Sequence, residues 1–161
     1  MGVPPDVAGQ SLSAAAPAFG RVEEIDWDGR IFKLILVENP TGCTQVLETF
    51  LRHRSGATIV IGVNDLDADG RDVSWLWDVP FECLPGRGHH IIAAGSRAYD
   101  VGLRLYYGGV ESTITEGITD AVAAAREQLR TGETGHLLTT YTAMYAARKH
   151  LRKMLPEMVR I

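Results

Sequence analysis

The pattern of hydrophobic and polar positions alternates between strand-like runs and segments of helical period from residue 20 onward. Two β-rich runs in "GRVEEIDWDGRIFKLILV" flank Asp28-Gly29, a dipeptide that favours the tight turn of a β-hairpin. The second run, residues 31–37, leads through "ENPTG" to residues 43–53, whose apolar positions have helical spacing. The pattern therefore predicts a hairpin followed by a strand-to-helix connection.

The rest of the chain repeats the order of strand and helix. "ATIVIGV" and "HHIIAAG" are typical of buried strands, and the second precedes a helix for which Ser96 is the expected N-cap. A short strand near residues 112–115 precedes an Ala-rich helix over 120–129, and "HLLTT" precedes a final amphipathic helix. This alternation predicts an α/β fold, doubly wound, with a mainly parallel sheet, helices on both faces and an N-terminal β-hairpin element.

Loops at the carboxyl ends of parallel strands share one rim of the sheet, where ligands gather in open α/β folds. Three loops are predicted at this rim: "ENPTG", the acidic segment "VNDLDADGRDVSWLWDVPFE" and "AGSRAYD". Residues 1–18 are rich in Pro, Ala and Ser and are expected to be a tail or the remnant of a linker. Residues 19–161 are expected to form one α/β domain.

Composition and charge narrow the function classes. The chain of 161 residues is 45% hydrophobic and 22% charged, which is ordinary for one globular domain. A net charge of −4 and the absence of a long basic run argue against a nucleic-acid partner. Two cysteines give no disulfide framework, and no apolar run has the ~18 residues of a membrane span. We expect a soluble cytoplasmic protein.

The acidic segment does not complete a metal site. Asp65, Asp67, Asp69 and Gly70 match the first half of a calcium loop, but the position that should supply a bidentate Glu is Leu76. Cys83, His89 and His90 lack a second ligand pair for zinc. We therefore predict no metal ligands in this chain.

Two other motifs of catalysis are missing. The chain has no Gly-Lys pair and hence no G-x-x-x-x-G-K-[ST] loop for ATP phosphates. Cys43 follows a strand in "PTGCTQ" but lacks the flanking glycines of a nucleophile turn, so we interpret it as a small buried residue. The sequence predicts neither ATP hydrolysis nor glutamine hydrolysis by this chain alone.

The other two loops each allow two interpretations. In "ENPTG", the backbone around Asn39, Pro40 and Gly42 could receive an anion or a substrate carboxylate. Alternatively, Asn39-Pro40 forms a turn and Thr41 caps the helix. In "AGSRAYD", Arg97 could clamp a carboxylate or phosphate, or form a surface ion pair with Asp100.

Four segments occur in the order and spacing of a known family. They are "AFGRVEEIDWDGRIFKLILVENPTG", "VNDLDADGRDVSWLWDVPFECL", "AAGSRAYDVGLRLYYGGV" and "TTYTAMYAARKHL". From about Pro17 to Leu155 the chain resembles the C-terminal domain of MurT, the Mur-ligase-like subunit of the bacterial lipid II isoglutaminyl synthase. Glu38 stands where the family commonly has Lys, and Thr41 replaces an Ala, so the first loop has lost a positive charge for binding an anion.

The resemblance implies a function for a complex rather than for this chain alone. The family amidates the D-isoglutamate of the lipid II stem peptide, using ATP and ammonia released from glutamine. ATP and Mg²⁺ belong to the full ligase subunit, and no cofactor is expected on this domain by itself. The partner is the glutaminase subunit GatD, which carries the catalytic Cys and His, and the membrane is involved only indirectly through lipid II. The resemblance places the triad's Asp at Asp72, in "GRDVSW".

The remaining residues of the acidic segment are interpreted as an interface or ligand loop. Trp75 and Trp77 are candidate aromatic anchors for the partner, although one of the two could instead be buried against the domain's own sheet. Polar and glycine positions around them complete the candidate loop: Asn64, Asp65, Gly70, Arg71, Asp78 and Arg97. The alternative function is a non-catalytic α/β binding module whose acidic loop holds Mg²⁺ or a cationic ligand.

Overall fold

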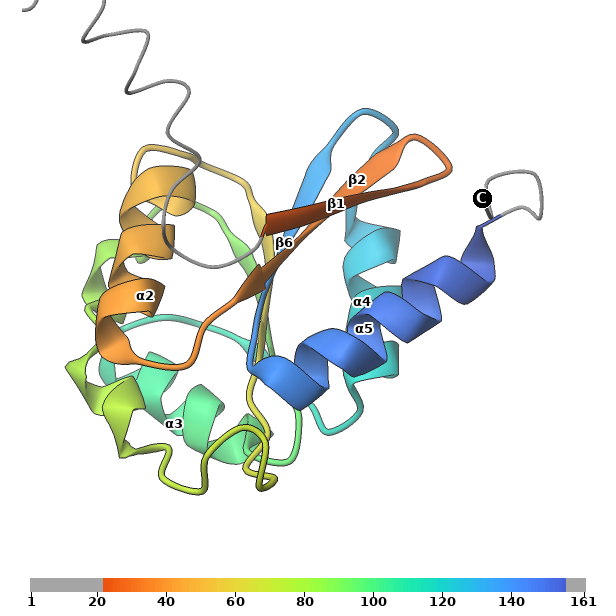
Figure 1. Ribbon diagram of the computed structural model, residues 1–161. Helices are drawn as coiled ribbons and strands as arrows, with labels where there is room; N and C mark the ends of the chain where they lie inside the picture. The colour runs from red at the N-terminus through yellow and green to blue at the C-terminus, as the bar shows by residue number, and fades with distance from the viewer. Residues whose placement is uncertain (1–21, 156–161) are drawn as a thin grey trace, which may run out of the picture.

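The computed structural model describes residues 22–155, which form a six-stranded sheet in the order β1-β2-β6-β3-β4-β5 (Figure 1). β1 pairs antiparallel with β2, and all other neighbours are parallel. The strands are β1 (Val22–Trp27), β2 (Arg30–Leu36), β3 (Thr58–Gly62), β4 (His90–Ala94), β5 (Thr113–Thr115) and β6 (Thr134–Thr139). The predicted doubly wound sheet with an N-terminal hairpin is confirmed, whereas the expected tail, residues 1–18, lies outside the described residues.

The hairpin turn has the conformation that its sequence predicts. Asp28 and Gly29 both have positive φ, at 54° and 75°, as a two-residue turn of type I′ requires. The Gly29 N–H donates to Asp26 Oδ1 at 2.7 Å, which stabilises the turn locally. A Cβ at Gly29 would also approach Thr131 Cγ2 to 2.8 Å, so both backbone conformation and space favour glycine here.

Helices cover both faces of the sheet (Figure 1). On one face α2 (Pro40–Val46), the π-helical turn η1 (Leu47–Leu51) and α3 (Ala98–Tyr107) pack around Ile35, Ile59 and Leu138. On the other face α4 (Ile118–Gln128) and α5 (Tyr141–Met154) pack around Phe32 and Val60. Residues 63–73, which we call the acidic loop, follow β3 and lead into two 3-10 turns, η2 (Ser74–Asp78) and η3 (Phe81–Cys83). None of the helices described between residues 22 and 155 has the length and apolarity to cross a membrane.

Two local predictions at helix starts are wrong. The first helix begins at Pro40 rather than near Cys43, because the Asn39 side chain accepts the Gly42 N–H and caps it, so Thr41 lies inside the helix. The N-cap position of α3 is Arg97 rather than Ser96, and no side chain caps this helix. The Ser96 hydroxyl instead donates to Asp65 Oδ1 at 2.7 Å.

A buried histidine lies in β6, near the starts of the parallel strands. His136 is 1% exposed, pairs in register with Lys33 and Ile59, and packs against Phe50 with ring centroids 6.1 Å apart. Neither ring nitrogen has a hydrogen-bond partner in the structure. Burial, reinforced by the positive charges of Arg54, Lys33 and His89, lowers the pKa of His136 to about 4. The folded state therefore holds this side chain neutral.

We expect His136 to make folding stability fall between about pH 6.5 and pH 4. In this range the unfolded chain binds a proton that the folded chain excludes, so stability is lost as the pH falls, by about 3 kcal/mol at most. Urea unfolding of the 161-residue chain at a series of pH values measures this. His136→Leu should flatten the profile in this window, while His90→Leu, at an exposed position, should not. Equal profiles for all three proteins would contradict the assignment.

Candidate functional site

The carboxyl ends of β3, β4 and β6 are joined by one side chain, Asn64. Its backbone N–H donates to Thr140 Oγ1 at 3.0 Å, and its Nδ2 donates to Thr142 Oγ1 at 2.9 Å. Its Oδ1 accepts the Ser96 N–H at 2.9 Å. Gly95 permits this approach, since a Cβ there would lie 2.4 Å from the Val63 carbonyl oxygen. The loops after three strands are therefore held together at a single point.

Asp69 links the acidic loop to the start of α5. Its Oδ1 accepts the Thr142 N–H at 2.7 Å, and its Oδ2 accepts the Thr142 hydroxyl at 2.6 Å. The residue at the N-cap position of α5, Thr140, makes no side-chain capping bond of its own. Asp69 thus supplies the cap from a distant loop, where a carboxylate also interacts favourably with the helix dipole.

Asp65 and Arg97 connect the acidic loop with the loop after β4. Asp65 receives the Ser96 hydroxyl at 2.7 Å and lies 3.5 Å from Arg97, and these contacts, Ser96 first, lower the pKa of Asp65. Arg97 also pairs with Asp100 at 2.9 Å. The predicted Arg97–Asp100 ion pair is therefore present, and Asp65 shares the same guanidinium.

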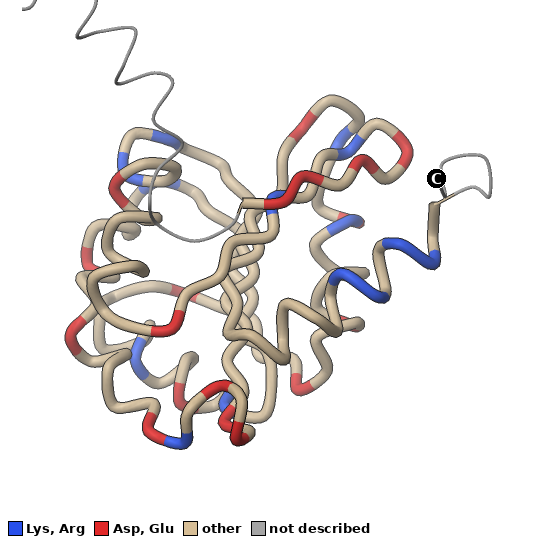
Figure 2. The backbone as a smooth tube through the Cα atoms, viewed as in Figure 1, with Lys and Arg blue, Asp and Glu red and all other residues tan. Residues whose placement is uncertain are grey.

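The carboxylates of the acidic loop bind to separate groups. Asp67 pairs with Arg71 on the surface, while Asp65 and Asp69 bind the groups described above. Figure 2 shows several acidic positions close together in this loop, at the bottom of the view. Within residues 22–155, no group of three or more His, Cys, Asp or Glu side chains is arranged to hold a metal ion.

Asp72 is exposed and lies where the loop turns into η2. Its Oδ1 accepts the Ser74 N–H at 2.8 Å, and this bond, with the Ser74 hydroxyl, lowers the pKa of Asp72. Within the described part of the chain, Ser74 is the only hydrogen-bond partner of this carboxylate. Asp72 also lines a hollow of about 300 Å³ together with Arg71, Val73, Ser74, Leu76, Trp77, Arg97 and Asp100. An ionised, oriented carboxylate is thus presented at the rim.

The two tryptophans have different environments. Trp75 is partly buried and packs against the domain's core, whereas Trp77 is 52% exposed. Gly70, with φ at 81°, turns the chain before them, and Asp78 is exposed at the end of η2. Of the two aromatic candidates, Trp77 is the one available to a partner.

The first loop lies at the same rim but serves α2. Asn39 caps that helix, Pro40 occupies its first turn, and the Gly42 N–H donates to Asn39 Oδ1 at 2.8 Å. No hydrogen bond or ion pair joins these three residues to the acidic loop within residues 22–155. The structure therefore assigns Asn39, Pro40 and Gly42 a capping role, and it does not bring them into the Asp72 hollow.

Cys43 is enclosed in the core and cannot act as a nucleophile in this conformation. It is 1% exposed, and burial raises the pKa of its thiol to about 12. A reactive cysteine needs access and thiolate character, both of which are missing here.

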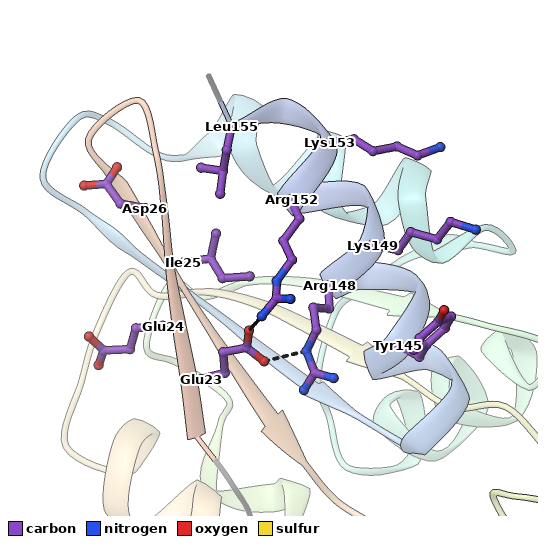
Figure 3. A pocket seen from close by; sticks show the side chains of 10 residues that line it. All are labelled: Glu23, Glu24, Ile25, Asp26, Tyr145, Arg148, Lys149, Arg152, Lys153 and Leu155. Carbon is purple, nitrogen blue, oxygen red and sulfur yellow. Dashed lines mark hydrogen bonds and ion pairs between the residues drawn. The ribbon is translucent and has the colours of Figure 1, made fainter. Parts of the chain in front are cut away.

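A larger hollow, of about 840 Å³, lies away from Asp72, between β1 and α5 (Figure 3). Its walls are joined by Glu23, which pairs with Arg148 and with Arg152. These ion pairs fasten the edge strand to the last helix. This hollow contains none of the residues that the sequence predicts for the site.

The chain matches the family described as MurT ligase C-terminal over residues 36–144. It belongs to that family. The MurT domain is also 30% identical over 148 residues to "Lipid II isoglutaminyl synthase (glutamine-hydrolyzing) subunit MurT" of Streptococcus pneumoniae, covering 88% of this chain and 32% of that protein. The chain therefore spans about a third of the length of this curated relative. The family predicted from the four sequence segments is confirmed.

Solved structures show the same fold at low sequence identity. Folylpolyglutamate synthase/dihydrofolate synthase of Yersinia pestis superposes with a TM-score of 0.58 at 17% identity, covering 96% of this MurT domain and 36% of that chain. A UDP-N-acetylmuramoyl-L-alanyl-D-glutamate–2,6-diaminopimelate ligase gives a TM-score of 0.54 at 15% identity, over 92% and 36% of the two chains. The domain therefore has the fold of a part of Mur-type ligases.

Sequence reasoning missed the residues of β6 and α5 that complete this rim. Thr140 Oγ1 accepts the Asn64 backbone N–H, Thr142 Oγ1 accepts from Asn64 Nδ2, and the Thr142 hydroxyl donates to Asp69 Oδ2. A signal for them exists in "HLLTTYT", since Thr residues between a strand and a helix are typical capping residues. Nothing in the sequence, however, shows that the partners come from a loop more than seventy residues earlier.

Asp69→Ala should lower the free energy of unfolding by about 1–2 kcal/mol, because α5 loses the only side-chain cap that it has among residues 22–155. Asp67→Ala is the matched control, since it removes only an exposed ion pair with Arg71 and should have no measurable effect. Urea unfolding of the 161-residue variants makes the comparison. Equal stability of the two variants would show that Asp69 does not cap α5.

Proposed function

We propose that this chain is the C-terminal domain of the ligase subunit of a glutamine-hydrolysing lipid II isoglutaminyl synthase. Membership of the MurT family and the similarity to the lipid II isoglutaminyl synthase subunit of Streptococcus pneumoniae support this proposal. The complex would form an amide on the stem peptide of lipid II, in the cytoplasm, and would reach the membrane only through that lipid-linked substrate. The partner would be the glutaminase subunit, GatD.

Within this complex, Asp72 is the third member of the glutaminase triad. The observation that carries this assignment is its state at the rim: an exposed carboxylate, oriented by the Ser74 N–H and with a lowered pKa. The other carboxylates of the same loop are less suitable. Asp65, Asp67 and Asp69 are already bound to groups of this domain.

The chemistry of Asp72 follows from its ionised state. It would accept the Nδ1–H of the partner's catalytic histidine, which fixes the tautomer whose other nitrogen takes the proton of the partner's cysteine. The negative charge would also stabilise the imidazolium formed in that step, and the thiolate would then attack the side-chain carbonyl carbon of glutamine. The imidazolium would give its proton to the amide nitrogen as the C–N bond breaks, and ammonia would leave for the ligase reaction. Water would then hydrolyse the thioester to glutamate and restore the partner's cysteine. The hollow beside Asp72 gives the histidine ring a place to enter.

The ATP reaction would belong to another part of the ligase subunit. The 161 residues contain no Gly-Lys pair and hence no phosphate-binding loop of the G-x-x-x-x-G-K-[ST] type. ATP and Mg²⁺ would therefore bind outside this domain, and none of the steps assigned to its residues involves them.

The isolated chain should have neither ATPase nor glutaminase activity. It lacks the phosphate loop, and its core cysteine, Cys43, is buried with a raised pKa. Coupled assays for phosphate and for ammonia released from glutamine test both activities. Ammonia release that disappears in Cys43→Ala would overturn the divided active site.

Asp72→Asn, introduced into the full ligase subunit and combined with the glutaminase subunit, should leave the complex intact and cripple glutamine hydrolysis. The amide keeps the shape of the side chain but loses the charge, and the rate could fall by up to about 10⁴-fold, as in other triads with this change. Asp67→Asn, on the same loop and paired with Arg71 on the surface, is the matched control and should hydrolyse glutamine normally.

Free ammonia separates the two half-reactions, because it bypasses glutamine hydrolysis. Asp72→Asn should amidate lipid II at the wild-type rate when ammonia is supplied. If ammonia-dependent amidation is lost as completely as the glutamine-dependent reaction, Asp72 serves the ligase reaction or the fold, and the triad assignment is wrong.

A further inference from the structure

An exposed aromatic surface lies beside the Asp72 hollow. It consists of Trp77 on η2 and of Tyr99, Leu103, Tyr106 and Tyr107 on α3, and we call it the aromatic face. The α3 positions recur at helical spacing, so they lie on one side of the helix, and each is more than half exposed. The rings lie side by side: the ring centroids of Trp77 and Tyr107 are 5.7 Å apart, and those of Tyr107 and Tyr106 are 5.9 Å apart. Contiguous exposed apolar surface of this kind marks an interaction site.

A buried arginine under this face holds it to the segment that carries Asp72. Arg104 is 4% exposed, and its guanidinium donates to the carbonyls of Leu76 at 3.1 Å and Val79 at 2.5 Å. It also pairs with Glu82 and lies 5.7 Å from the Trp77 ring. Because Arg104 belongs to α3 and its acceptors to η2 and the turn after it, the two parts of the aromatic face form one rigid surface.

The aromatic face continues into the Asp72 hollow. Trp77 belongs to both, and Asp100, one residue from Tyr99, lines the hollow. A subunit whose histidine reaches Asp72 must therefore cover the adjacent rings. Tyrosine and tryptophan are also the residues that contribute most to binding at protein interfaces, where they can be desolvated without leaving a charge unpaired.

The excess of acidic residues around the aromatic face indicates which kind of partner would fit it. Residues 65–107 contain seven Asp and Glu against four Arg, and three of those arginines, Arg71, Arg97 and Arg104, are paired with carboxylates of the same domain. A partner that fits would present an apolar patch with a basic rim. A second copy of this chain, with the same excess of acid, fits less well.

From these observations we infer that the aromatic face is the docking surface for the glutaminase subunit, with Trp77 and Tyr107 at its centre and Arg104 as the positioning residue beneath it. The inference rests on the proposed function, because it takes the partner from there. It adds which side of the domain the partner covers and which side chains hold it.

Binding of the glutaminase subunit to the ligase subunit, measured by titration calorimetry, tests the inference. Trp77→Ala and Tyr107→Ala should each raise Kd by at least about 30-fold, as hot-spot residues do. Tyr145→Ala is the matched control, since this tyrosine is 59% exposed but lies on α5, and it should leave Kd within about twofold. All three side chains are exposed, and circular dichroism verifies that each variant is folded.

The outcomes separate the docking surface from the function. If Trp77→Ala and Tyr107→Ala bind as the wild type does while Asp72→Asn still loses glutamine hydrolysis, the surface is wrong and the proposed function stands. If the wild-type subunits do not bind at all, the proposed function fails. Loss of self-association in these variants, with unchanged affinity for the glutaminase subunit, would make a second copy the occupant and overturn the inference. An equal loss of affinity in Tyr145→Ala would also overturn it.

Discussion

The arrangement of the rim depends on the hydrogen bonds of Asn64. Parallel strands place their carboxyl ends at one edge, but the loops that follow leave in different directions, and their backbone groups need partners. Asn64 is the residue that satisfies groups after β3, β4 and β6 together. Its amide supplies both a donor and an acceptor, which neither an aspartate nor a leucine of similar size could do.

From this junction the acidic loop acquires a fixed path. Thr142 accepts from Asn64 and donates to Asp69, so the loop is tied to α5 one step further along the same network. Asp65 is tied to the opposite side through Ser96 and Arg97. These bonds hold the loop on both sides. The segment that carries Asp72 therefore starts from a fixed position at the rim. Two of the carboxylates that stand out in the sequence, Asp65 and Asp69, therefore hold the loop in place.

The sequence predicted the fold well because its signals are local. The turn at Asp28-Gly29, the apolar strand over residues 57–63 and the alternation of strand and helix each depend on a few neighbouring residues, and the structure contains all of them. The helix starts were predicted less well. At the first helix, Asn39 accepts the Gly42 N–H and so supplies the cap. At α3, the Ser96 hydroxyl does not cap the helix because it donates to Asp65, which comes from another loop. The sequence predicts a candidate loop but not its contacts with Thr140 and Thr142 or those of Arg104. These contacts join residues distant in sequence, which periodicity does not show.

The contrast between Trp75 and Trp77 shows how one short segment can serve both the domain and a partner. In a 3-10 turn, residues two apart point in different directions, so Trp75 reaches the core while Trp77 faces outward over Arg104. Arg104 donates to the carbonyl of Leu76, in η2, and to that of Val79, directly after it. Without these hydrogen bonds, a docked partner would bury both carbonyls unpaired. The conformational entropy of this surface is therefore lost when the domain folds. A partner that docks there does not have to order the segment that carries Asp72, which favours binding.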